Sequence, residues 1–326
     1  MATKKSKSSN KSNKTKSTKP KTANESAKKA ELKAETTSAI EEIEEIEEIE
    51  EIKEEVSKPI SSKKEKKSSI KSFFSRKYEP KESILTVFKT PRFYGALLGE
   101  IIGTMLIALL LFSLSLMGIA NMATYSFAVI AVLIAVYAFS GSCLNPIITV
   151  GMMASRRISV IRGIMYIIAE IIGAWLGWLI FNAFHLAGGE TAYDIPAISA
   201  IGEGKFWVVA FVELLGAFII SFFFARALKY KRSVFTFAAV VAGGLAIAVV
   251  IGYVISAAFL TLNNNFVFNP AVATMMQIFP QSGENFGEIL GGICQALSAY
   301  AIIPMIGGVI GFYLSDIVAR LSGDDE

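Results

Sequence analysis

The chain has 326 residues, of which 53% are hydrophobic, and its mean hydropathy is +0.50 although its first 80 residues are strongly polar. Two cysteines are too few for a disulfide framework, and one histidine leaves little scope for metal binding or His-based catalysis. No basic patch interleaved with aromatic residues indicates nucleic-acid binding, so the composition favours a membrane protein that is not an enzyme.

The first 80 residues are predicted to be a disordered cytoplasmic tail. Lys/Ser/Thr/Asn repeats fill residues 3–22, Glu-Glu-Ile triplets run over 41–52, and a Lys-rich block covers 61–71. Such segments cannot bury enough apolar surface to offset the entropy of the chain. They also lack the apolar core of a secretory signal. The lysines favour contact with anionic membrane lipid, while a tail without a specific partner is the simpler interpretation.

Six apolar stretches follow, each long enough to span the hydrocarbon core at ~20 residues. They cover residues 94–118, 124–141, 159–185, 206–228, 234–258 and 288–317. Two shorter pieces, about 145–154 and 269–279, begin at Asn-Pro dipeptides. Ten helical residues reach only ~15 Å, half of a membrane. We therefore predict two half-helices, meaning helices that enter the membrane from one surface and end inside it.

Basic residues concentrate on one side of these spans. They are Lys71, Arg76, Lys77, Lys81, Lys89 and Arg92 before the first span, then Arg156, Arg157, Arg162, Lys229, Lys231, Arg232 and Arg320. The opposite loops contain Lys205 as their one basic residue, beside Glu190, Asp194 and Glu203. The positive-inside rule then places both termini in the cytoplasm of a multi-pass cell-membrane protein, which an even number of spans requires.

The spans contain an internal repeat. Gly99–Thr104 in the first span resembles Val212–Ala217 in the fourth, and an Asn-Pro site follows the glutamate of each copy. Each copy therefore has three spans and one half-helix, and an odd number of spans inverts the second copy. The predicted domains are the tail at 1–80, a membrane domain at 93–319 with repeats at 93–187 and 205–317, and a short acidic tail at 320–326.

The two boxes, Asn145-Pro146-Ile147 and Asn269-Pro270-Ala271, are predicted to meet near the membrane midplane. Irregular backbone at that depth is tolerated only against protein or a water-filled cavity. The inverted half-helices bring two N-termini together, each with about half a positive charge. Such a centre, with two amide side chains, favours neutral hydroxylic molecules and repels cations. The alternative is that each Asn only caps its helix, a position that Asn prefers.

Glu100, Glu170 and Glu213 lie well inside the predicted spans, where a charge is costly unless it faces the bundle interior. Glu100 and Glu213 occur once per repeat, so we interpret them as structural carboxylates that accept hydrogen bonds from re-entrant backbone N–H groups. A proton relay is the alternative. Glu170 lies on a stripe of small residues that predicts close helix packing: Gly163, Gly173, Ala174 and Gly177.

Residues 93–319 resemble the major intrinsic protein family, the aquaporins and glycerol facilitators. The resemblance is carried by Glu100 with Gly103, Ser140–Pro146, Glu213 with Gly216, Asn269-Pro270-Ala271, and Pro304–Gly308 with Gly311, Tyr313 and Asp316. It implies an all-α membrane fold with six transmembrane helices and two re-entrant half-helices in an inverted repeat. It also implies a homotetramer with one pore per subunit, passive transport of water and small uncharged solutes such as glycerol, and no cofactor or metal.

The chain departs from this family at two positions. Ile147 stands where the family usually has alanine, and we expect it to alter packing rather than block the pore. Val272 stands where the family usually places an arginine in its outer constriction. Counting back from the two Asn residues without gaps predicts an apolar outer constriction made of Tyr125, Ala257, Phe266 and Val272.

An apolar constriction lacks an electrostatic barrier and a strong donor. It predicts a pore that passes glycerol-like solutes as well as water, with an ordinary water pore as the alternative. Cys143 is either a pore thiol or a small buried filler. Two other function classes stay open: an ion- or proton-coupled transporter that uses Glu100, Glu170 and Glu213, and a non-conducting membrane scaffold whose tail recruits partners.

Overall fold

The computed structural model describes residues 87–115, 122–188, 205–230, 233–259, 266–279 and 283–323. The predicted tail at 1–80 and the end of the predicted acidic tail, 324–326, lie outside the described residues. Within the described ranges the regular elements are helices, and no strand is present. The all-α fold class predicted from the sequence is therefore confirmed.

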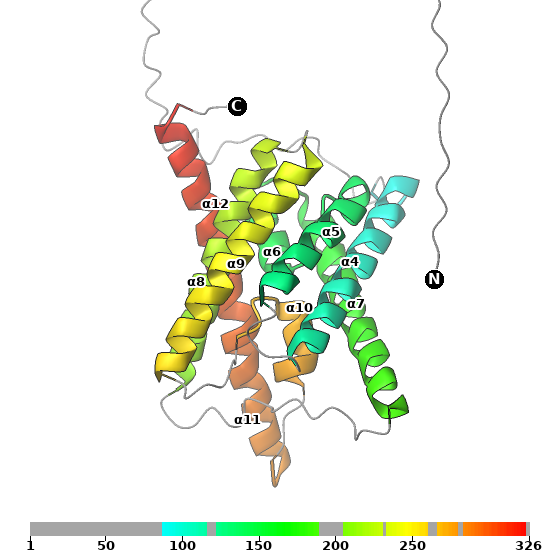
Figure 1. Cartoon of the computed structure of the whole chain (residues 1–326), viewed down its shortest axis with the longest axis vertical. Helices are drawn as coiled ribbons and strands as arrows, with labels where there is room; N and C mark the ends of the chain where they lie inside the picture. Colours follow the sequence, from blue (N-terminus) through cyan, green and yellow to red (C-terminus); the bar gives the residue numbers. More distant parts are fainter. Residues whose placement is uncertain are drawn as a thin grey trace, which may run out of the picture. The chain divides into compact units, whose positions relative to one another are not determined.

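Each of the six predicted spans contains a helix in its described residues (Figure 1). They are α4 (Pro91–Ser115), α5 (Met122–Ser140), α7 (Val160–Ala187), α8 (Phe206–Ala227), α9 (Val234–Phe259) and a last continuous run of α11 (Phe286–Leu297), η5 (Ser298–Ile302) and α12 (Ile303–Leu321). Five are long and apolar enough to cross a membrane, and the apolar part of α5, Thr124–Ser140, is shorter. The short η3 (Leu228–Tyr230) extends α8.

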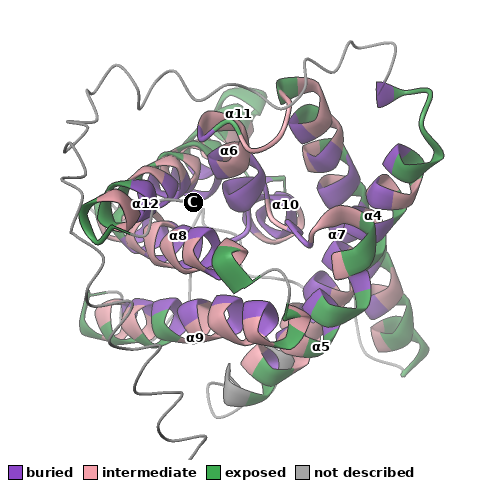
Figure 2. Ribbon diagram, turned by 90° about the horizontal axis from the view of Figure 1, so that it is seen from above, coloured by how far each residue is buried: buried purple, intermediate pink, exposed green. Residues whose placement is uncertain are grey.

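The two predicted half-helices are also present, and each begins at the expected proline. One is α6 (Pro146–Ala154); the other is α10 (Pro270–Ala273), which continues into η4 (Thr274–Ile278). The nine residues of α6 correspond to about 14 Å, half of the hydrocarbon core. Figure 1 shows α6 above α10 near the middle of the bundle, and Figure 2 shows both inside a ring of longer helices.

The helices pair in the same way in both halves of the bundle. The first helix of each half packs on the third and second, so α4 contacts α7 and α5 just as α8 contacts α12 and α9. Contacts between α5 and α9 join the halves. The internal repeat predicted from Glu100 and Glu213 is therefore visible as a repeated pattern of helix packing.

Glycines allow the closest of these approaches. A Cβ atom at Gly173 or Gly177 of α7 would clash with carbonyl oxygens of α4, at Ile101 and Met105. On α12, Gly307 and Gly311 stand in the same relation to the carbonyl oxygens of Leu214 and Phe218 on α8. Small residues at this four-residue spacing let membrane helices approach with their backbones in contact.

Apolar side chains cover the outside of the described helices. Phe127, Phe211, Val254 and Ile306, on four different helices, are all exposed. An apolar exterior of this extent is typical of a surface that faces lipid. Buried polar groups, including Glu100, Glu170 and Glu213, lie instead inside the bundle.

Candidate functional site

Both half-helices are capped by the asparagine of their box. Asn145 Oδ1 accepts a hydrogen bond from Ile147 N at 3.0 Å. Asn269 Oδ1 accepts from Ala271 N at 3.1 Å and from Val272 N at 3.4 Å. Both asparagines have extended backbone, and the proline that follows each one takes the first helical position, where its missing N–H costs nothing. Capping therefore uses the side-chain oxygen and leaves the side-chain nitrogen for other bonds.

Those nitrogens join the two half-helices. Asn145 Nδ2 donates to the Phe268 carbonyl oxygen at 2.7 Å, and Asn269 Nδ2 donates to the Leu144 carbonyl oxygen at 3.0 Å. Each asparagine therefore binds the residue that precedes the other. Because a primary amide carries two N–H donors, each side chain keeps a second N–H for another acceptor.

Glu100 and Glu213 hold the backbone just before each box. Glu100 Oε1 accepts from Cys143 N at 3.2 Å, and Glu100 Oε2 accepts from Leu144 N at 2.6 Å. Glu213 accepts from Val267 N at 2.5 Å, and both of its oxygens accept from Phe268 N, at 3.1 and 3.3 Å. Both carboxylates are fully buried. They therefore satisfy N–H groups that an interrupted membrane helix would leave unpaired.

The glycine three residues after each glutamate has a matching task. Leu144 and Phe268 both have φ of 52°, in the left-handed region, and their side chains lie against α4 and α8. A Cβ atom at Gly103 would clash with the Leu144 side chain, and one at Gly216 would clash with the Phe268 ring. The repeated Glu-x-x-Gly pattern thus supplies both a carboxylate for the backbone and space for the side chain.

Helix α7 forms polar contacts with both half-helices. Thr149 Oγ1 of α6 donates to Glu170 Oε1 at 2.6 Å, while Glu170 Oε2 has no hydrogen-bond partner within the described residues. Trp175 Nε1 donates to Thr274 Oγ1 at 2.9 Å, and Thr274 Oγ1 donates to the Ala271 carbonyl oxygen at 2.6 Å. Thr149, Trp175 and Thr274 were not among the site residues predicted from the sequence. A threonine four residues after one box asparagine and five after the other is the signal that could have found two of them.

Comparison with known proteins decides the family. Residues 87–317 match the family model described as Major intrinsic protein. The chain belongs to the major intrinsic protein family. It is therefore a multi-pass membrane protein, as its sequence pattern predicted.

Individual relatives are distant. The chain is 25% identical to Aquaporin AqpM of Methanothermobacter marburgensis over 186 residues, 57% of this chain and 71% of that one. It is 29% identical to Glycerol uptake facilitator protein-like 6 of Lactiplantibacillus plantarum over 205 residues, 60% of this chain and 83% of that one.

Other matches are shorter or structural. Probable aquaporin PIP2-5 of Arabidopsis thaliana is 32% identical over 98 residues, 29% of this chain, so the match spans about a third (32%) of the plant protein's length. The aquaglyceroporin of Plasmodium falciparum, a solved structure, is 14% identical, with a TM-score of 0.46 over 70% of this chain and 95% of that one.

The first departure from the family pattern, Ile147, lies in a packed contact. Its side chain is completely buried, and a Cβ atom at Gly308 of α12 would lie 2.7 Å from both Ile147 Cγ2 and the Ile147 carbonyl oxygen. The repeated pairs Gly173-Ala174 and Gly307-Gly308 align Gly308 with Ala174. The large residue in the first box therefore faces a position without a side chain.

The second departure, Val272, is enclosed. It is completely buried in an apolar cluster that includes Phe112 and Ala174. Of the other predicted constriction residues, Tyr125 is buried in a separate cluster, and Ala257 and Phe266 are half-buried. The Phe266 ring stacks on the Phe268 ring with centroids 4.8 Å apart and planes at 24°. The assignment of these four residues to one constriction stays a prediction.

Cys143, the predicted pore thiol, is buried. Its side chain belongs to the same apolar cluster as Leu144 and Tyr166, and its backbone N–H donates to Glu100. Among the residues that the structure covers there is no group of His, Cys, Asp and Glu that could hold a metal ion. The access of a reagent to this thiol from the pore stays a prediction.

Proposed function

We propose that this protein is a passive membrane channel for water and small uncharged solutes such as glycerol. The observation that carries the proposal is the reciprocal pair of bonds from Asn145 to Phe268 and from Asn269 to Leu144. Two helix N-termini meet there, and each adds about half a positive charge. The amide N–H groups that remain serve neutral oxygen acceptors, while the fixed positive potential opposes cations.

The buried carboxylates support a channel over a coupled transporter. Both oxygens of Glu100 and both oxygens of Glu213 accept backbone N–H groups. A proton relay would need these oxygens to exchange partners during each cycle, at the cost of unpaired backbone groups in a membrane interior. Glu170 binds Thr149 and holds a half-helix in place.

The proposed outer constriction is apolar, with Tyr125, Ala257, Phe266 and Val272 as its members. The Val272 side chain supplies neither a positive charge nor a hydrogen-bond donor at the position where the family usually has both. We therefore extend the proposal to a pore that also passes solutes that are larger and less polar than water. Ala257 provides width, and the aromatic rings of Tyr125 and Phe266 provide apolar walls.

The proposed assembly is a homotetramer in the cell membrane with both termini in the cytoplasm. The start of α4 and the end of α12 lie at the same end of the bundle (Figure 1). The described basic residues Arg156, Arg157 and Arg320 belong to loops or helix ends that the positive-inside rule assigns to the cytoplasm.

Stopped-flow light scattering on proteoliposomes tests the proposal. Wild-type vesicles should shrink faster than empty vesicles in a water gradient and should also take up glycerol faster. Val272→Arg should lower glycerol uptake more than water flow, because it adds a fixed cation and narrows the path. Val272→Met, which adds length without charge, is the matched control. Rates equal to those of empty vesicles would refute the channel, and rates that follow a pH gradient would favour the transporter.

A further inference from the structure

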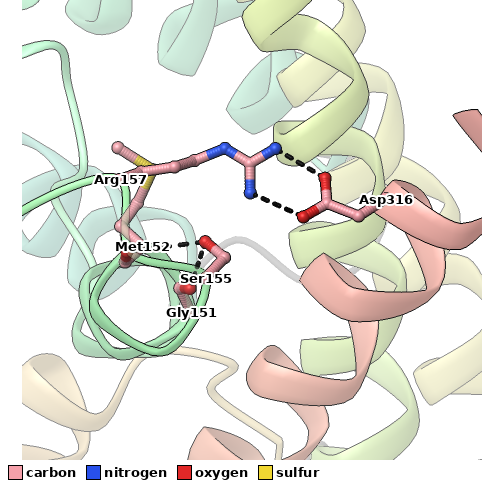
Figure 3. Close-up of polar contacts among 5 residues, drawn as sticks. All are labelled: Gly151, Met152, Ser155, Arg157 and Asp316. Carbon is pink, nitrogen blue, oxygen red and sulfur yellow. Dashed lines mark hydrogen bonds and ion pairs between the residues drawn. The ribbon is translucent and has the colours of Figure 1, made fainter. Parts of the chain in front are cut away.

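The segment just after the C-terminal end of α6, far from Asn145, is bound to α12 by an ion pair (Figure 3). Arg157 Nη2 lies 2.7 Å from Asp316 Oδ1, and Arg157 Nη1 lies 3.3 Å from Asp316 Oδ2. The two side chains are 19% and 10% exposed, so the pair is largely shielded from solvent. A bidentate guanidinium–carboxylate pair fixes orientation as well as distance.

Three further contacts surround this pair. The Arg157 guanidinium lies 5.4 Å from the centre of the Phe312 ring, within the range of a cation–π contact. The Phe312 ring occupies the space beside Gly151, where a Cβ atom would clash with it. Tyr313 Oη donates to the Ala154 carbonyl oxygen at 2.8 Å. We call this set the α6 clamp, made of Gly151, Ala154 and Arg157 with Phe312, Tyr313 and Asp316.

The backbone at the end of α6 directs Arg157 toward α12. Ser155 ends the helix, and its Oγ donates to the Gly151 carbonyl oxygen at 2.7 Å (Figure 3). Arg156 follows with φ of 58°, a left-handed conformation that a non-glycine residue keeps only where its surroundings impose it. Arg157 N then donates back to the Met152 carbonyl oxygen at 2.8 Å. The chain therefore turns sharply between the helix and the clamp.

The clamp and the meeting point of the half-helices lie at opposite ends of one short, rigid helix. A displacement of α6 along its axis would pull Asn145 away from the Phe268 carbonyl oxygen. The second half-helix is held differently, by a hydrogen bond between two uncharged side chains, from Trp175 to Thr274. We propose that Arg157 and Asp316 are a positioning pair that fixes the height of α6 and thereby sets the permeability of the pore. This inference rests on the proposed channel function.

Permeability measurements on four variants test the pair. Arg157→Ala and Asp316→Ala should each lower water permeability per channel about fivefold or more, the lower end of typical coupling between two sites. The exchanged pair, Arg157→Asp with Asp316→Arg, should recover most of that loss. If the alanine variants lost permeability only because a side chain is missing from the packing, the exchanged pair would not recover it. Lys229→Ala removes an exposed basic residue from η3, away from the α6 clamp, and should match the wild type.

Hydrogen–deuterium exchange gives a readout that does not need conduction. In the two alanine variants, exchange should rise in peptides that cover 145–155, while peptides that cover 270–279 should stay protected. If wild-type vesicles fail to conduct but this pattern appears, the channel proposal fails and the clamp stands. If permeability and exchange both match Lys229→Ala, the positioning pair is refuted.

Arg157→Lys guards against misfolding of the alanine variants. Lysine keeps the charge but loses the bidentate geometry. It should therefore give permeability between those of the wild type and Arg157→Ala at an unchanged melting temperature. If the alanine variants do not fold, wild-type permeability and exchange in Arg157→Lys would overturn the inference.

Discussion

The packing and hydrogen bonding around the two boxes depend on pairs of residues with complementary roles. Glu100 works with Gly103 and Glu213 with Gly216, so one motif serves the backbone and the side chain together. The first box adds a pair of its own, in which the large Ile147 side chain packs against Gly308, a residue that has no side chain. Such pairs predict effects that are not additive.

The Ile147 and Gly308 pair gives a stability prediction. Gly308→Ala should destabilise the protein by about 1–3 kcal/mol, because its new methyl group overlaps Ile147. Ile147→Ala should cost about 2–5 kcal/mol, because it leaves a cavity. The double variant should be more stable than the sum of these costs implies, since Ile147→Ala removes the Cγ2 atom that the new methyl group would overlap, although the contact with the Ile147 carbonyl oxygen remains. Thermal unfolding in detergent would measure this, and strictly additive losses would show that the two side chains do not interact.

The residues that sequence reasoning could reach share one property: their signal is local and occurs twice. Asn145 and Asn269 are marked by the proline that follows, and Glu100 and Glu213 by their shared spacing to glycine. Arg157 and Asp316 lie 159 residues apart, and neither belongs to a motif that occurs twice in the sequence, so no pattern joined them before the structure did. The contact of Ile147 with Gly308 is likewise a product of tertiary packing.

At the scale of helices, the order and type of elements follow from hydrophobic length and from the two Asn-Pro dipeptides. The six spans and both half-helices lie within a few residues of the ranges expected from the sequence. The π-helical turns of η4 and η5 were not foreseen. A π turn accommodates one extra residue where the packing of neighbours requires it, and the local sequence carries no mark of that requirement.

Helix α7 supports both half-helices, and the two supports should fail separately. Trp175→Phe removes the donor to Thr274, and Thr149→Val removes the donor to Glu170; each loss should cost about 1 kcal/mol. Amide exchange should rise in peptides covering 270–279 for the first variant and in those covering 145–155 for the second. Thr149→Ser, which keeps the hydroxyl, is the matched control. Equal changes in both regions would show instead that α7 itself has shifted.

At the scale of the whole molecule, the membrane bundle is a compact unit defined by contacts among its own residues. Residues Arg76–Glu326 form one compact unit by their own contacts. Two apolar clusters run through it, one that includes Tyr125 and Phe268 and another that includes Val272 and Tyr300. The elements that support the boxes, from α4 to α12, all belong to this unit.

Removing the N-terminal tail should therefore leave the bundle intact. Deletion of residues 2–75 should not change the melting temperature or the water permeability per channel, because the contacts described for the bundle lie within the remaining unit. The same deletion should weaken binding to vesicles that contain anionic lipid, because it removes most of the lysines. A lower melting temperature would show that the tail packs on the bundle.

The crossed amide bonds also constrain the order of assembly. Asn145 finds its acceptor at Phe268, which is made 123 residues later. Because synthesis proceeds from the N-terminus, the first half-helix is made before the acceptor of Asn145 exists. Neither repeat can therefore form the hydrogen bonds of its asparagine side-chain nitrogen without the other repeat. The contact between the two half-helices therefore forms late in folding. A chain truncated before Phe268 would be inserted in the membrane but would lack a complete pore.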